Sequence, residues 1–307
     1  MNLKKLQTKL TIALLFLTAL SSIYGQTGVK NILENTGAKI KKSKIKSQTT
    51  WVYTLSNGSL EKVKTSYREY DKAGVITKQI VYDLNGNILS EGSYAYDKNG
   101  QVISSRSVKN GKNAANNIYK YDADNRIKKV ETYDDQNKLV AEMNYTYSAN
   151  GKVSQLETSS PDKKSDIVFI YSYDADGNIV EVKTEDRINA INSRGEFKYN
   201  GNGKEIEMTT YNGEGKIVRI REKKYDENGF LSSVTTKNAK GQVISREIIK
   251  NDEKGNEIEK VSSNPAANFS KKLESKYDEN GNLLEQLIYN KLGELVSKVV
   301  NEYEYYK

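Results

Sequence analysis

The chain has 307 residues, with 22 tyrosines and 21 glycines but no histidine, no cysteine and only two prolines. The missing residue types exclude a Ser-His-Asp triad, a Cys-His dyad, disulfide bonds and the ordinary zinc, haem and iron–sulfur sites. The formal net charge of +8 comes from lysines in the first 46 residues. The remainder is charge-balanced and therefore does not predict a nucleic-acid groove.

Residues 1–25 are typical of a secretory signal peptide. Lys4, Lys5 and Lys9 precede an apolar run over residues 10–20, and small residues follow it. This run is too short to span a bilayer, which needs about 20 residues, so we expect a cleaved signal rather than an anchor. No later stretch is apolar enough for a transmembrane segment. We therefore expect an exported protein that is periplasmic, on the outer surface or extracellular.

Residues 26–50 form a lysine-rich leader ahead of a single repeat domain at residues 51–307. The lysines cluster between Lys39 and Lys46, a pattern that can contact an anionic surface. A solvated leader or first strand explains the cluster better, because the charge does not continue into the domain.

The rest of the chain repeats a Tyr-Asp-x-x-Gly phrase. Clear copies begin at Tyr70, Tyr96, Tyr173, Tyr225 and Tyr277. The intervals between successive turns alternate between 12 and 14 residues, so the repeat has a 26-residue period made of two unequal halves. A period of this length is typical of proteins built by stacking one supersecondary unit.

Each half of the period predicts one strand followed by one turn. Aspartate at the first turn position caps the backbone two residues on, and glycine at the fourth position adopts the left-handed conformation. Such turns join antiparallel strands through a bulge. The predicted structural turn residues are Asp71, Gly74, Asp83, Gly86, Asp97, Gly100, Asp174, Gly177, Asp226, Gly229, Asp278 and Gly281.

These halves predict an all-β fold, a long antiparallel meander of about 18–20 strands made of 26-residue two-strand repeats. Sheets of more than about 10 strands tend to curl or close, so we expect an open barrel or spiral, and the sequence leaves full closure undecided. Strict alternation places Ile76, Ile80 and Tyr82 on one face. We expect this tyrosine face to point inward.

The period also sorts the turns onto two rims, because alternate turns of a meander lie at opposite ends. The ten positions from 71 to 304 include seven aspartates, and tyrosine precedes nine of them. The ten positions from 57 to 290 include five asparagines, and tyrosine precedes only four. We name these the tyrosine–aspartate rim and the asparagine-rich rim.

About a dozen such copies in register resemble the YD repeat of bacterial RHS proteins and teneurins, over about residues 53–306. The family usually has arginine after the glycine, whereas this chain has Asn87, Gln101 or Lys152 there. The resemblance implies the strand-and-turn architecture. It does not imply encapsulation. Large RHS proteins form a shell around a toxin, and 307 residues are too few for a shell of that size or for a toxin domain. Residues 211–216 also resemble antitoxin-type repeats.

The tyrosine–aspartate rim is a candidate for cation binding. Same-rim turns lie two strand spacings apart, about 9–10 Å, which is too far for two turns to share one calcium at roughly 2.4 Å. Asp174, Asp176 and Asn178 match part of a calcium loop but lack its terminal glutamate. Turn capping explains the aspartates better, so we expect no metal and no cofactor.

Tyrosine pairs at alternate positions lie on one face near the tyrosine–aspartate rim. Such rings offer a rigid stacking surface for sugars or peptides, although burial in the core competes with that role. The possible ligand platform consists of Tyr94, Tyr96, Tyr119, Tyr121, Tyr145, Tyr147, Tyr171 and Tyr173.

Paired carboxylates for glycoside hydrolysis are the remaining catalytic option, since the chain has 40 acidic residues. An active site would interrupt the repeat, and degenerate units lie at residues 103–118, 157–170, 184–198 and 260–274. Drift or longer loops explain these units better.

The sequence therefore predicts a non-enzymatic, exported repeat protein that serves as a binding or scaffold module at the cell envelope. Its expected partner is a protein or a polysaccharide, with no nucleic acid. The alternatives are an immunity or antitoxin-like accessory protein and, less favoured, a carboxylate-based polysaccharide hydrolase. The identity of the ligand and the oligomeric state stay open.

Overall fold

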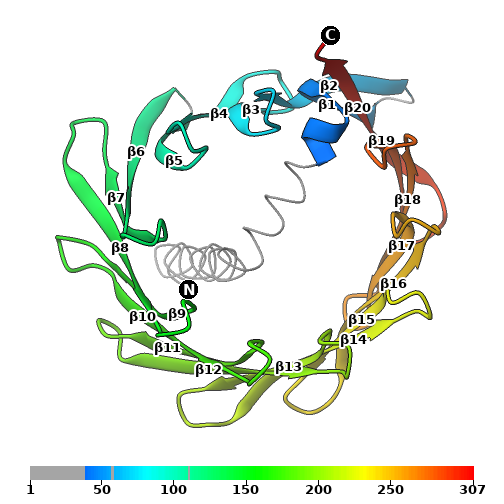
Figure 1. Cartoon of the computed structure of the whole chain (residues 1–307). Helices are drawn as coiled ribbons and strands as arrows, with labels where there is room; N and C mark the ends of the chain where they lie inside the picture. The colour runs from blue at the N-terminus through cyan, green and yellow to red at the C-terminus, as the bar shows by residue number, and fades with distance from the viewer. Residues whose placement is uncertain (1–38, 57–58, 110) are drawn as a thin grey trace, which may run out of the picture.

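A computed structural model describes residues 39–56, 59–109 and 111–307 (Figure 1). Residues 39–42 form a short helix, and strands make up most of the remainder. The strands are β1 (Ile45–Ser56), β2 (Ser59–Tyr70), β3 (Ile76–Tyr82), β4 (Ile88–Tyr96), β5 (Val102–Lys109), β6 (Lys112–Tyr121), β7 (Ile127–Tyr133), β8 (Leu139–Tyr147), β9 (Val153–Ser159), β10 (Asp166–Tyr173), β11 (Ile179–Asp186), β12 (Ile191–Tyr199), β13 (Glu205–Asn212), β14 (Ile217–Tyr225), β15 (Leu231–Asn238), β16 (Val243–Asn251), β17 (Glu257–Asn264), β18 (Phe269–Tyr277), β19 (Leu283–Tyr289) and β20 (Leu295–Tyr305).

The strands form one antiparallel meander that closes into a ring (Figure 1). Each strand pairs with its neighbours in chain order, and β1 also pairs with β20 from Ile45↔Tyr305 to Thr54↔Ser297. This last pairing closes the barrel that the sequence left undecided. The predicted all-β meander of about 18–20 strands is confirmed, with 20 strands in the sheet.

The turns have the hydrogen bonds that the repeat predicts. In the first of them, the Gly74 N–H donates to the Asp71 carbonyl (3.0 Å), and the Asp71 carboxylate accepts from the N–H groups of Ala73 and Val75 (2.8 and 2.9 Å). Gly74 has a φ of 83°, a conformation that glycine adopts without steric cost. All twelve predicted turn residues lie in turns of this kind, which fix the hairpins at both rims.

A second irregularity follows most of the turns and corrects the predicted faces. Tyr70 lies opposite Ile76, but regular pairing resumes only at Lys78, so one residue is left over. Such a bulge inverts the alternation of side chains. Ile76 therefore shares a face with Tyr70, whereas Ile80 and Tyr82 lie on the other face. The expectation that Ile76, Ile80 and Tyr82 share one face is wrong.

The bulges send the tyrosines of the two rims to opposite faces of the sheet. The short helix at residues 39–42 lies inside the ring (Figure 1), where Ile40 packs against Tyr70, Ile76 and Tyr303. The face that carries the tyrosines of the tyrosine–aspartate rim is therefore the inner face. By the register, the tyrosines that precede turns of the asparagine-rich rim point outward, so the expected inward tyrosine face holds for one rim only.

The inner face has an apolar sector on strands β8 to β12. Leu156 and Phe169 are only 2% and 3% exposed, and they cluster with Ile167, Tyr171 and Val182. The outer face instead carries ion pairs between neighbouring strands, such as Lys78–Glu91 (3.0 Å). The ring thus has an apolar inner wall over this sector and a charged outer surface.

The described residues include no helix long and apolar enough to span a membrane. The predicted signal peptide lies outside these residues, as does most of the predicted leader. The first strand begins at Ile45 and pairs with two neighbours over its length. The end of the leader is thus part of the ring.

Candidate functional site

The tyrosine platform lies on the inner face, and half of its hydroxyls bond the backbone. The tyrosine that ends a strand at the tyrosine–aspartate rim donates to a carbonyl at the start of the preceding strand. The bonds are Tyr96 to Ile76, Tyr121 to Val102, Tyr147 to Ile127 and Tyr173 to Val153, with lengths of 2.6 to 2.7 Å.

These bonds close a gap that the meander leaves open at this rim. Strands β3 and β4 are joined by a turn only at the asparagine-rich rim, and their regular pairing ends at Lys78↔Ser93. The Tyr96 hydroxyl bonds the Ile76 carbonyl just beyond that end. The same bond recurs around the ring to Tyr303, and Asn251 makes it where a tyrosine is missing.

The other four tyrosines of the platform pack into the inner wall. Tyr171 is 6% exposed, and its hydroxyl has no hydrogen-bond partner among the described residues. Burial raises the pKa of Tyr145 to about 12, and the Tyr119 hydroxyl lies 3.3 Å from the Ser105 hydroxyl. Tyr94 is partly buried. The rings therefore contribute to the wall as well as presenting a surface.

The turns of the tyrosine–aspartate rim are tied to one another. The residue after the turn glycine reaches the next turn on the same rim: Lys152 donates to the Gly177 carbonyl (2.6 Å), and Gln101 donates to the Asn125 carbonyl (3.0 Å). Lys204 bonds the Gly229 carbonyl in the same way. The positions where the family usually has arginine thus link neighbouring turns here.

The aspartates of this rim are engaged within their own turns. The Asp174 carboxylate accepts from the backbone and side chain of Asn178, and the side-chain bond is the main cause of its lowered pKa. The part of the chain that the structure describes has no group of three or more acidic residues placed to hold a metal ion.

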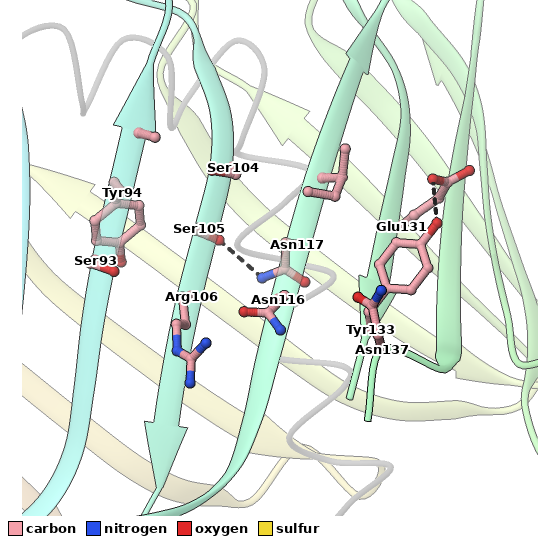
Figure 2. Close-up of a pocket in the computed structure, with 12 residues that line it drawn as sticks. Ser93, Tyr94, Ser104, Ser105, Arg106, Asn116, Asn117, Glu131, Tyr133 and Asn137 are labelled. Atoms are coloured by element: carbon pink, nitrogen blue, oxygen red, sulfur yellow. Dashed lines mark hydrogen bonds between the residues drawn. The ribbon is translucent and has the colours of Figure 1, made fainter. Parts of the chain in front are cut away.

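A polar hollow of about 580 Å³ lies on β4 to β7, in the first degenerate unit that the sequence identified (Figure 2). Two rows of residues cross its floor on the outer face of the sheet. The first row runs Ser93, Arg106, Asn116 and Tyr133, and the second runs Ala95, Ser104, Ile118 and Glu131.

The far wall of the hollow is rigid and charged. The Tyr133 hydroxyl donates to Glu131 (2.9 Å), as Figure 2 shows, and Lys120 donates to the other oxygen of Glu131 (2.7 Å). The bond from Lys120 is the main reason that the pKa of Glu131 falls to about 2. Glu131 is thus an ionised ion-pair partner and not a proton donor near neutral pH. The interrupted repeat is the one sequence feature that could have pointed to this hollow.

The other degenerate units are hairpins with altered turns. The unit at residues 157–170 spans β9 and β10, joined by a turn in which Lys163 has a φ of 55°. Asp186 caps the turn before β12 by accepting from Ile188 and Asn189. The unit at residues 260–274 joins β17 to β18 through Asn264, whose side chain accepts from the Ala267 N–H. These units keep the meander in register.

Family comparison covers most of the sequence. The model described as Teneurin YD-shell matches residues 20–160 and 131–248, and the MORN repeat variant matches residues 272–291. None of the curated proteins matches the sequence.

Solved structures that match this chain in part include TcdB2-TccC3-TEV, a Tc holotoxin pore and a porin-like protein. The crystal structure of TcdB2-TccC3-TEV has a TM-score of 0.41 and 14% identity, covering 80% of this chain and 15% of the matched chain. The Tc holotoxin pore of Photorhabdus luminescens has a TM-score of 0.34 and 11% identity, and the match covers 82% of this chain and 18% of the matched chain. A porin-like protein from Bacteroides uniformis has a TM-score of 0.38 and 10% identity, and the match covers 85% of this chain and 97% of the matched chain. The chain thus spans less than a fifth of the toxin chains that it matches.

Proposed function

Because the chain belongs to the Teneurin YD-shell family, we propose that it is an exported, non-enzymatic ring scaffold whose inner wall binds a protein at the cell envelope. The closed ring with an apolar, tyrosine-lined inner sector is the observation that carries the proposal. The buried cluster of this sector is bordered by partly buried rings, Tyr145, Tyr173 and Phe197, which are the part of the inner wall that a ligand would contact. Many acids on the outer face lie in ion pairs, such as Glu142, Glu259 and Glu285, which favours a structural role over catalysis for them.

The inner wall is chemically uneven, which favours a protein ligand over a polysaccharide. The apolar sector on β8 to β12 is followed by β14, where Arg219 and Arg221 lie on the inner face and are exposed. Neither guanidinium has an ion-pair partner among the residues described. A protein with apolar and acidic surfaces would complement both sectors.

Affinity capture of the mature protein from its own envelope extract tests this function. Arg221→Glu reverses one inner-face charge, and Lys224→Glu reverses an exposed outer-face charge on the same strand as the matched control. We expect Arg221→Glu to lose a captured protein that Lys224→Glu retains. Equal capture by both variants would contradict the inner wall as the binding surface. Mass spectrometry of the mature N-terminus separately tests cleavage near residue 25.

A further inference from the structure

The outer hollow interrupts the charged pattern of the outer face. On either side of it, charged residues pair across neighbouring strands, as Lys78–Glu91 (3.0 Å) and Lys120–Glu131 (2.7 Å) do. Between these pairs, the small residues Ser93, Ala95 and Ser104 occupy outer positions of β4 and β5 beside Arg106. Small side chains in place of long charged ones open the space.

Four polar side chains of the hollow have no hydrogen-bond or ion-pair partner in the part of the chain that the structure describes. Among the residues that the structure describes, none hydrogen-bonds or forms an ion pair with the side chains of Arg106 and Asn116, which lie side by side on β5 and β6 (Figure 2). Ser93 and Ser104 hydroxyls are likewise unpaired there. These side chains together offer a cation, an amide and two hydroxyls to a ligand.

Tyr133 adds a fixed aromatic ring at the end of the same row. Its hydroxyl donates a hydrogen bond to Glu131 (2.9 Å), which favours one orientation of the ring. The row from Ser93 to Tyr133 crosses four strands, a width of about 14 Å, and the volume of about 580 Å³ lies within the range of ligand sites.

We propose that this hollow binds an acidic saccharide, a short oligomer that carries a uronic acid carboxylate. The guanidinium of Arg106 matches a carboxylate through two parallel hydrogen bonds. Asn116 and Ser104 are placed to bond ring hydroxyls, and Tyr133 offers a face for a pyranose ring. The ionised Glu131 is already paired with Lys120 and leaves the charge of Arg106 to the ligand. The site lies on the outer face and does not depend on protein binding inside the ring.

Titration calorimetry of the full-length mature protein with trigalacturonic acid tests the proposal. The methyl ester of the same trisaccharide removes the carboxylate charge and keeps the sugar hydroxyls. Arg106→Gln removes the expected carboxylate partner, and Arg246→Gln, at an exposed outer position of β16, is the matched control. Ser104→Phe fills the hollow without changing charge, and thermal melts establish that each variant is folded.

We expect Arg106→Gln and the methyl ester each to weaken binding by about tenfold or more, and Ser104→Phe to abolish it. Arg246→Gln should bind as the wild type does. No binding of trigalacturonic acid by the wild type, equal binding of the ester, or wild-type affinity in folded Arg106→Gln would each overturn the proposal.

Discussion

The two rims of the ring are built from related turns but are held in different ways. At the tyrosine–aspartate rim, tyrosines point inward and bond backbone carbonyls, as Tyr225 does with Glu205 (2.7 Å). At the asparagine-rich rim, tyrosines point outward, and Tyr133, Tyr211 and Tyr289 bond carboxylates, as Tyr211 does with Glu196 (2.8 Å). The inward tyrosines therefore link the backbones of neighbouring strands, and the outward tyrosines belong to the charged network of the outer surface.

The two rims differ because a single bulge determines the face of the sheet on which a repeated tyrosine lies. The bulge beside the turn, where a hairpin has one, inverts the side-chain alternation between one rim and the next. Tyrosines separated by half a period thus enter environments of opposite polarity. High pH should therefore destabilise the ring through the inward tyrosines, and low pH through the outward tyrosine–glutamate pairs.

The largest effect should come from raising the pH. Burial raises the pKa of Tyr145 and of Tyr199 to about 12 from the ordinary 10.0. A raised phenol pKa means that the folded state holds its proton more tightly, so this stability is complete below pH 10 and is lost as the pH rises towards 12. We expect cooperative unfolding in that window, followed by circular dichroism and phenolate absorbance. Ionisation of every tyrosine near pH 10 with the ring intact would contradict inward burial.

Turn glycines on the two rims should differ in their tolerance of valine. Gly255 and Gly241 both have positive φ (82° and 76°), so a β-branched residue strains either backbone. A Cβ at Gly255 would also meet the Phe230 ring, whereas one at Gly241 meets nothing within 4 Å. We expect Gly255→Val to cost roughly 3–4 kcal/mol and Gly241→Val roughly 1–2 kcal/mol, measured as the free energy of unfolding in urea.

Gly229→Val makes this comparison sharper. It lies on the same rim as Gly255, but its Cβ would meet only the flexible end of Lys204. We expect a cost of more than roughly 1 kcal/mol, closer to that of Gly241→Val than to that of Gly255→Val. Equal costs at all three sites would mean that the turns of the tyrosine–aspartate rim do not pack on one another.

The turn chemistry could be predicted from the sequence because it is local. Asp226 and Gly229 lie within one turn, and their types alone specify its hydrogen bonds. The inversion of faces could not be predicted, because the extra residue opposite Tyr225 lies inside a stretch that still alternates regularly. Periodicity detects where the strands are but not a bulge within them.

Closure and the outer hollow depend on contacts far apart in the sequence. The seam joins Gln48 and Thr50 to Asn301 (3.0 and 2.7 Å) and joins Tyr306 to the Tyr70 carbonyl (2.6 Å). These residues have no repeat signature that marks them as partners. The hollow likewise exists only because small residues of β4 and β5 meet in register, which the sequence does not display.

Removing single hydroxyls tests the two kinds of tyrosine directly. Tyr225→Phe leaves the Glu205 carbonyl without that donor in a partly buried place, and we expect a loss of about 1 kcal/mol. Tyr211→Phe leaves Glu196 with its ion-pair partner Arg194 (3.1 Å), so we expect a loss of less than about 0.5 kcal/mol. Urea melts of both variants measure the difference. A larger loss for Tyr211→Phe would reverse the roles assigned to the two rims.

The smallest effect should come from acid acting on the outer pairs. Hydrogen bonds from Lys120 and then from Tyr133 lower the pKa of Glu131 to about 2 from 4.5. A lowered carboxyl pKa means that the unfolded state binds the proton more tightly, so this stability is present above pH 4.5 and is lost as the pH falls towards 2. Glu131→Gln should therefore flatten the fall of the melting temperature across that window, and Glu214→Gln, at an exposed turn position, should leave it unchanged. Parallel profiles for wild type and Glu131→Gln would mean that the outward tyrosine–glutamate pair does not stabilise the folded ring. The inward tyrosines would then be the only ones of the two kinds that stabilise it.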